Sequence, residues 1–262
     1  MGHPPPPKAT AIIPARLGST RFPGKVLAAD TGRPMVVHVC EQASKAESVD
    51  RVVVATDAEE VASAVREHGF EAVLTSAEHA TGTSRVAEAA SLLKLGLQAC
   101  VINVQGDEPE IESDAIDGVL TRFHPMALEC YTVATTINDP SASSSPSVVK
   151  VVTTTPNEKG YRRALYFSRS SIPFHRDRES VGDAVAGTLR HVGIYAYTPA
   201  TLNELRTLSP TPLEQAEQLE QLRWLEHGLP IAVAIRESSH TGIDTPEQYA
   251  AFVERHRARQ TP

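Results

Sequence analysis

Three cationic side chains lie within ten residues near the start of the chain. They are Arg16, Arg21 and Lys25, in the segment IIPARLGSTRFPGK (12–25). An apolar run ends where this segment begins and predicts a buried strand, and Gly18 lets the backbone approach a ligand closely. A cationic loop at the carboxyl end of a first strand is where open α/β sheets bind phosphates. We therefore expect a phosphate-binding loop here, with a solvated basic loop as the alternative.

Two familiar phosphate motifs are excluded. A Walker A loop has four residues between its glycines and a Ser or Thr after its lysine, but five residues separate Gly18 from Gly24, and Val26 follows Lys25. No Gly-x-Gly-x-x-Gly segment opens a helix, which argues against a dinucleotide-binding fold. This loop should therefore bind phosphates mainly through its side-chain cations.

Two carboxylates have the chemistry of magnesium ligands, since Mg²⁺ prefers one or two carboxylates together with substrate phosphates. Asp107 comes directly after an expected apolar strand at 100–104, at the edge where the cationic loop should lie. Glu108 is a weaker candidate. Asp244 precedes Pro246 and could instead begin a helix, and Asp107 could instead cap the next turn, so the residues alone leave both alternatives open.

Two further groups of residues could bind substrate. In the segment ATGTSR (80–85), a helix start with Gly82 and Arg85 could contact a base or ribose, or Thr83 could simply cap the helix. In the second half, arginines follow an expected strand, and Arg is the side chain best shaped to bind a carboxylate in a bidentate manner. His191 lies in an apolar strand, where a histidine is more often structural.

These segments resemble a known family. IPARLGSTRFPGK resembles the signature loop of the sugar-acid cytidylyltransferases, most closely the CMP-Kdo synthetase (3-deoxy-manno-octulosonate cytidylyltransferase) family. The segments NVQGDEP (103–109), RHVGIYAY (190–197), LEQLR (219–223) and GIDTPE (242–247) are also similar to this family, so the resemblance covers nearly the whole chain. Thr81 and Ser84 depart from the family's SGTER segment, and SPSVVK (145–150) replaces its NPNxVK-like segment.

The resemblance implies Mg²⁺-dependent transfer of CMP from CTP to a small acidic sugar, most closely Kdo, by direct in-line attack with release of pyrophosphate. The metal ligands would be Asp107 and Asp244, and the catalytic residues Arg16, Arg21, Lys25, Asp107 and Asp244. The residues expected to bind CTP are Ala15, Arg16, Gly18, Ser19, Arg21, Lys25, Gly82, Thr83, Arg85, Gln105 and Gly106. The resemblance places the acceptor on Arg169, Arg176, His191, Tyr195, Glu220 and Gln221.

Two other functions remain open. Arginine outnumbers lysine 19 to 6, a bias that fits organisms that need not make lipopolysaccharide, where the acceptor could be a small phosphonate such as phosphonoformate. A sialic-acid acceptor fits the second-half segments less well. The second is a non-catalytic regulator that binds nucleotide. Loss of Lys25, Asp107 or Asp244 would have indicated such a regulator, and all three residues are present.

Composition narrows the class of protein. A net charge of −7 argues against a general nucleic-acid binder, whose affinity comes from neutralising phosphates. No apolar run approaches the length of a membrane span and no signal peptide is apparent. Cys40, Cys100 and Cys130 lack metal-ligand spacing and are expected to be reduced, buried thiols of a cytoplasmic protein.

Alternating apolar strands and amphipathic helices predict an α/β protein: a three-layer, Rossmann-like nucleotidyltransferase fold with a mostly parallel central sheet. Residues 1–8 are rich in proline and should form a flexible tail, and 9–262 should form one domain. Its first half, 9–125, would bind CTP. Its second half, 126–262, would bind the acceptor and carry an antiparallel hairpin around the turn at 156–160, a candidate contact in the homodimer that the resemblance implies. A long helix is expected at 212–227.

Overall fold

The computed structural model describes residues 8–18, 21–121, 123–156, 162–174, 176 and 187–260. Within these residues, nine strands form one sheet. Ser19 and nearly all of the predicted N-terminal tail lie outside the described residues, as does the expected hairpin turn after Pro156. The strands are β1 (Ala9–Ala15), β2 (Val49–Thr56), β3 (Glu71–Leu74), β4 (Cys100–Asn103), β5 (Cys130–Thr136), β6 (Lys150–Thr153), β7 (Arg162–Ser168), β8 (Leu189–Tyr197) and β9 (Ile231–Ile235).

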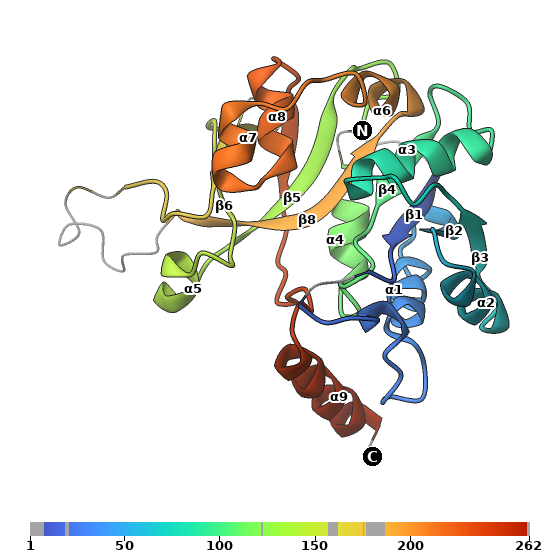
Figure 1. The fold of residues 1–262 in the computed structure, drawn as a ribbon. Coiled ribbons are helices and arrows are strands. Elements are labelled where there is room, and N and C mark those ends of the chain that lie inside the picture. Colours follow the sequence, from blue (N-terminus) through green and yellow to red (C-terminus); the bar gives the residue numbers. More distant parts are fainter. Residues whose placement is uncertain are drawn as a thin grey trace.

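Helices cover both faces of this sheet (Figure 1). They are α1 (Met35–Ala43), α2 (Glu59–Glu67), α3 (Gly82–Leu92), α4 (Ser113–Gly118), α5 (Pro140–Ser144), α6 (Pro199–Leu205), α7 (Pro212–Glu217), α8 (Glu220–Glu226) and α9 (Pro246–Gln260), with a 3-10 turn η1 (Lys25–Leu27). No helix in the described part of the chain is both long and apolar enough to cross a membrane.

The sheet is mixed, with strand order β3-β2-β1-β4-β8-β5-β9-β7-β6. The first four strands are parallel, as expected, but β8 runs antiparallel to both β4 and β5. The prediction of a mostly parallel sheet is therefore wrong for the second half. The strands β6 and β7 pair antiparallel, which confirms the predicted hairpin. The start of β8 also pairs antiparallel with β6, so β8 continues the antiparallel arrangement into the centre of the sheet.

The helix predicted at 212–227 is two helices. Gln218 adopts the left-handed conformation (φ 53°) and ends α7, and α8 begins at Glu220. A non-glycine residue in this region interrupts the helical hydrogen bonds. The break leaves Glu220 in the first turn of α8.

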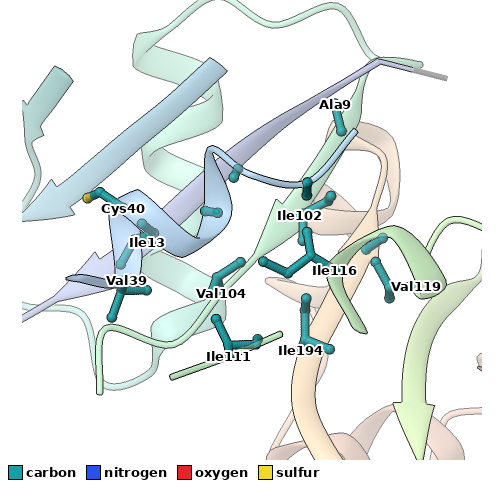
Figure 2. Close-up of a cluster of buried hydrophobic side chains, with 14 of the residues drawn as sticks. Ala9, Ile13, Val39, Cys40, Ile102, Val104, Ile111, Ile116, Val119 and Ile194 are labelled. Carbon is teal, nitrogen blue, oxygen red and sulfur yellow. The ribbon is translucent and has the colours of Figure 1, made fainter. Parts of the chain in front are cut away.

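Side chains of successive strand residues enter opposite cores. Ile13 packs in a cluster with residues of α1, α2 and α4, whereas Ile12 packs with residues of α3, α6 and α8. Figure 2 shows the first cluster, where Ile13 and Ile102 of the sheet lie near Val39 and Ile116 of the helices. Burial of both faces explains why these strands are apolar throughout instead of alternating. The three cysteines are free and buried, as predicted, and burial raises the pKa of each thiol.

The parallel pairing of β1 and β4 brings the segments that follow them together. Val104 N donates to Ile12 O at 3.2 Å, so the chain after β4 continues alongside β1. At Gly106 the two segments approach so closely that a Cβ would lie 2.9 Å from the carbonyl oxygen of Pro14. This close approach sets the cationic loop beside Asp107.

A third, smaller cluster fixes the segment that carries Asp244. Ile243, three residues before α9, packs together with Tyr249 and Phe252 of α9 and with Met35, and Phe22 of the cationic loop joins them. The rings of Phe22 and Tyr249 are 5.5 Å apart. The cationic loop is therefore held against α9 by apolar contact.

Hydrogen bonds attach the segment between β9 and α9 to the start of α4. The carboxylate of Glu112 accepts from the backbone N–H groups of Ser239 (2.9 Å) and His240 (3.2 Å) and from the hydroxyl of Ser238 (3.0 Å). The His240 ring contacts Glu112 through Nδ1 and Glu108 through Nε2, the latter at 3.2 Å. These hydrogen bonds to Glu108 and Glu112 raise the pKa of His240 to about 9, against the opposing effect of burial.

Replacing Gly106 by Ala should destabilise the protein by about 1–3 kcal/mol, because the added methyl group meets a backbone oxygen that cannot turn aside. Urea unfolding followed by circular dichroism measures the change. Gly96→Ala is the matched control, since a Cβ there meets nothing within 4 Å, and its effect should stay within about 0.5 kcal/mol. Equal effects of the two substitutions would contradict the close approach of the two segments.

Replacing His240 by Gln should lower the free energy of unfolding by roughly 2–3 kcal/mol near neutral pH. Because the folded pKa of His240 is raised from 6.5 to about 9, its charge stabilises the fold fully below pH 6.5, and this contribution is lost as the pH rises through about 9. Urea unfolding of wild type and variant at pH 7 and pH 10 checks this. The charged neighbours Glu108, Glu112 and Arg190 are common to both proteins. A stability difference that stays constant over this range would contradict a protonated His240.

Candidate functional site

The cationic loop, the segment after β4 and the start of α3 enclose a pocket with a volume of about 280 Å³. It lies at the carboxyl ends of β1 and β4, where α/β sheets bind ligands. The lining residues are Pro14, Arg16, Arg21, Lys25, Val26, His79, Ala80, Thr81, Gly82, Arg85, Gln105, Gly106, Asp107 and Asp244. All five residues predicted to be catalytic therefore lie around one cavity.

The ammonium group of Lys25 lies between both predicted metal ligands. Lys25 Nζ is 2.6 Å from Asp107 Oδ2 and 3.1 Å from Asp244 Oδ1, and it donates to the carbonyl oxygen of Ile243 at 3.0 Å. Arg21 Nη2 lies 3.0 Å from the other oxygen of Asp244. The side chain of Lys25 is only 12% exposed. Two cations from one loop thus neutralise two carboxylates that come from distant parts of the sequence.

Asp107 has competing electrostatic influences. Desolvation raises its pKa above the ordinary value, and Lys25 acts in the opposite direction through its charge and its hydrogen bond. A carboxylate that is short of water and close to other acidic groups gains from any cation placed against it. The site is therefore built to hold positive charge beside Asp107.

The oxygen atoms around Lys25 Nζ suit a hard divalent cation. Two carboxylates and the carbonyl of Ile243 converge on this one nitrogen, and Mg²⁺ is bound by oxygen ligands. Among the described residues, no group of three or more His, Cys, Asp or Glu side chains could hold a metal alone. Asp107 and Asp244 therefore fit a magnesium ion that takes its remaining ligands from water and substrate phosphates, as Mg²⁺ usually does.

At the other end of the pocket, α3 begins against β1. Thr81 caps the helix by accepting from Ser84 N at 3.2 Å, and Gly82 lies against the ring of Pro14. Gln105 Nε2 donates to Asn103 Oδ1 at 3.1 Å, which fixes the orientation of the Gln105 amide. The free N–H groups of a helix start and an oriented amide can bind a polar ligand.

Some predicted CTP contacts have other partners. Arg85 is only 4% exposed; its guanidinium donates to Thr75 Oγ1 at 2.6 Å and lies 3.6 Å from Asp57. Thr83 is buried and donates to Glu220 Oε2 at 2.8 Å. The backbone-contact candidates Ala15 and Gly18 adjoin the pocket in sequence, but they are not among its lining residues.

The predicted acceptor residues do not line this pocket. The guanidinium of Arg169 donates to backbone carbonyls, at 2.9 Å to Glu217 and 3.1 Å to Pro146, and Arg176 is exposed. His191 Nε2 lies 3.0 Å from Thr132 Oγ1, and burial lowers the pKa of His191 to about 3. His191 is therefore neutral.

Three predicted acceptor residues gather between β8 and α8. The rings of Tyr195 and Trp224 are 5.0 Å apart, and the Tyr195 hydroxyl is buried with no hydrogen-bond partner among the described residues. Gln221 is buried, and burial raises the pKa of Glu220. A buried hydroxyl without a partner is costly, so Tyr195 is suited to bind a polar group that arrives with a ligand.

Two residues near the site were missed from the sequence. His79 lines the pocket, with Nδ1 at 3.1 Å from Ser84 Oγ and Nε2 in contact with Glu88. His240 bridges Glu108 and Glu112. The position of His79 just before a helix start was an available signal, whereas His240 stands in a polar segment with no periodic pattern.

Comparisons with known proteins show the family of this chain. A family model described as "Cytidylyltransferase" matches residues 10–235. A 3-deoxy-manno-octulosonate cytidylyltransferase from Syntrophobacter fumaroxidans is 45% identical, over 94% of this chain and 96% of the relative. An enzyme of the same name from Neisseria meningitidis serogroup A is also 45% identical, over 90% of this chain and 93% of the relative.

Solved structures agree as well. The structure of CMP:2-keto-3-deoxy-manno-octonic acid synthetase complexed with CTP superposes with a TM-score of 0.85 and 38% identity, covering 96% of this chain and 99% of the other. A cytidylyltransferase from Leptospira borgpetersenii (TM-score 0.58, 16% identity, covering 94% of this chain and 85% of the other) shares the fold. The chain belongs to the cytidylyltransferase family, because the family model matches most of its length and a relative is 45% identical over 94% of it.

Proposed function

We propose that this protein transfers CMP from CTP to 3-deoxy-manno-octulosonate (Kdo), in a reaction that depends on Mg²⁺. The observation that carries the proposal is the convergence of Arg16, Arg21, Lys25, Asp107 and Asp244 on one pocket at the carboxyl ends of β1 and β4. The names of the relatives and the CTP bound in the similar solved structure support the substrates.

The reaction is a direct displacement. The 2-hydroxyl oxygen of the acceptor attacks the α-phosphorus of CTP in line, and the bond from this phosphorus to the oxygen bridging the α- and β-phosphates breaks. Pyrophosphate leaves with that oxygen, and the hydroxyl proton passes to solvent. Such transfers depend on positioning and on neutralising charge, so no covalent enzyme intermediate is needed.

The loop cations act on the phosphates. In the structure, Lys25 is held by Asp107 and Asp244, and Arg21 by Asp244. The triphosphate offers these cations several anionic oxygens in place of the carboxylates. Arg16, Arg21 and Lys25 would then stabilise the negative charge that develops on the leaving pyrophosphate.

Asp107 and Asp244, freed from Lys25, would hold Mg²⁺. The chemistry that this ion supplies when bound is charge neutralisation at the α-phosphate and a lowered pKa for the attacking hydroxyl. Asp107 is suited to this role because its surroundings already favour a nearby cation. The base and ribose would lie toward Gly82, Gln105 and Gly106 at the other end of the pocket.

The acceptor would bind near β8 and α8. The resemblance to the family implies that its contacts are Arg169, Arg176, His191, Tyr195, Glu220 and Gln221. Tyr195 brings a buried hydroxyl that has no hydrogen-bond partner in the part of the chain that the structure describes. His191 brings a neutral ring. Arg169 would act either on the acceptor directly or by holding the segment it contacts, since its guanidinium already binds three backbone carbonyls.

We also propose that the protein is a cytoplasmic homodimer in which the β6–β7 hairpin contributes to the interface. Two large apolar side chains near this hairpin are exposed: Leu165 on β7 (60%) and Phe174 (81%). Leu165 lies on β7 and Phe174 lies six residues beyond its end, and exposed apolar side chains of this size can form part of an interaction surface. A phosphonate acceptor gains no support from the relatives.

The proposal is tested by measuring pyrophosphate release from CTP and MgCl₂ with Kdo, sialic acid and phosphonoformate as acceptors. Turnover should occur with Kdo and should require Mg²⁺. Turnover with phosphonoformate alone would keep the CTP chemistry and refute the acceptor. No release with any of the three would refute the acceptor and favour a protein that binds nucleotide without reacting.

Substitutions of the two carboxylates test the residues in the same assay. Asp107→Asn and Asp244→Asn should each lower the rate by about 100-fold or more, because each removes a carboxylate that would hold the Mg²⁺ that neutralises the phosphates. Asp114→Asn is the matched control, since this exposed aspartate in α4 lies outside the pocket, and its rate should be unchanged. Wild-type rates in both carboxylate variants would refute their role.

A further inference from the structure

The His240 ring lies between two carboxylates and is almost fully enclosed. Its Nε2 is 3.2 Å from Glu108 Oε2, its Nδ1 contacts Glu112 Oε2, and only 2% of the side chain is exposed. The two ring nitrogens of a protonated histidine are both donors and point in different directions. His240 can therefore connect two carboxylates that do not contact each other.

The segments joined by this ring carry the proposed metal ligands. Glu108 is next to Asp107, and His240 precedes Asp244 by four residues. A backbone hydrogen bond from Ile243 N to Asp107 O at 2.8 Å attaches the same two segments. The ring and this bond thus hold the segment after β4 against the segment before α9.

The charges around His240 balance. Two anions, Glu108 and Glu112, face two cations, His240 and Arg190. The guanidinium of Arg190 donates to Ser238 O at 2.8 Å, so it holds the same segment from the side of β8. Groups that are buried and charged are tolerated when they are paired and hydrogen-bonded.

A metal ion demands more of this geometry than Lys25 does. The ammonium group accepts oxygen distances of 2.6 to 3.1 Å, whereas Mg²⁺ requires near-octahedral ligands at about 2.0–2.1 Å. The separation of Asp107 and Asp244 must therefore be held closely. Neither of these side chains contacts His240, Glu108 or Glu112, so His240 would act on them through the backbone segments that it joins. Residues that hydrogen-bond directly to metal ligands change metal affinity by about 10–100-fold when replaced, and His240 would act one step further out, through the segments that carry the ligands.

We propose that His240, clasped between Glu108 and Glu112, is a positioning residue that sets the separation of Asp107 and Asp244 for the divalent cation that binds with CTP. This inference rests on the proposed function, because it assumes that the two aspartates bind a metal. It assigns a role to three residues outside the pocket lining.

Mn²⁺ in place of Mg²⁺ gives a readout that does not depend on turnover, because free Mn²⁺ is counted by electron paramagnetic resonance. In the presence of CTP, His240→Leu should weaken Mn²⁺ binding by about 10–100-fold. CTP binding measured in EDTA should change by less than about twofold, because the loop cations are intact. His240→Gln, which keeps one donor, should recover part of the affinity.

His38→Gln is the matched control. Taken as whole residues, His38 and His240 are equally buried, each 5% exposed. His38 contacts Thr31 and Phe252 but neither Glu108 nor Glu112. Unchanged Mn²⁺ affinity in the His240 variants, or an equal loss in His38→Gln, would overturn the proposal. If His240→Leu does not fold, His240→Gln and Glu112→Gln decide by the same criterion. A wild-type protein with no CTP-dependent Mn²⁺ site would refute the proposed function instead.

Discussion

The ion pairs of Lys25 with Asp107 and Asp244 are the interaction on which the candidate site depends. Without a cation between them, two carboxylates within reach of one ammonium group would repel each other in a partly desolvated pocket. The loop therefore supplies a cation of its own to the two carboxylates. Under the proposed function, the phosphates of CTP would bind Lys25, and Asp107 and Asp244 would hold the metal ion, an exchange of one cation for another. The parallel β1 and β4, the contact at Gly106 and the clasp around His240 all serve to hold the three groups together.

Much of the fold could be predicted from the sequence because the strands are buried on both faces. Continuous apolar runs marked β1, β2 and β4, and the helices between them predicted parallel neighbours. The direction of β8 could not be predicted, because the apolar pattern of a strand does not depend on its direction. Only the pairing of β8 with β4 and β5 determines whether it runs parallel or antiparallel to them. The break between α7 and α8 was also missed, because Gln218 is an ordinary helix former and nothing in its type marks the left-handed conformation that it adopts.

The site was predictable in part. The cationic loop and Asp107 each follow an apolar strand, which places them at one edge of the sheet. Asp244 was decided only by the family resemblance, because a carboxylate before Pro246 is equally a helix start. The contacts of Lys25 span 82 and 219 residues of sequence, beyond the reach of any local pattern. The engagement of Arg85 with Thr75 and Asp57 was hidden for the same reason.

A pair of crystal structures, without ligand and with CTP and Mn²⁺, tests the exchange most directly. Anomalous scattering locates Mn²⁺ without ambiguity. We expect Lys25 between Asp107 and Asp244 in the first structure. In the second we expect Mn²⁺ bound by both aspartates, with Lys25 moved onto the phosphates of CTP. A metal bound elsewhere while Lys25 stays between the two carboxylates would contradict the account.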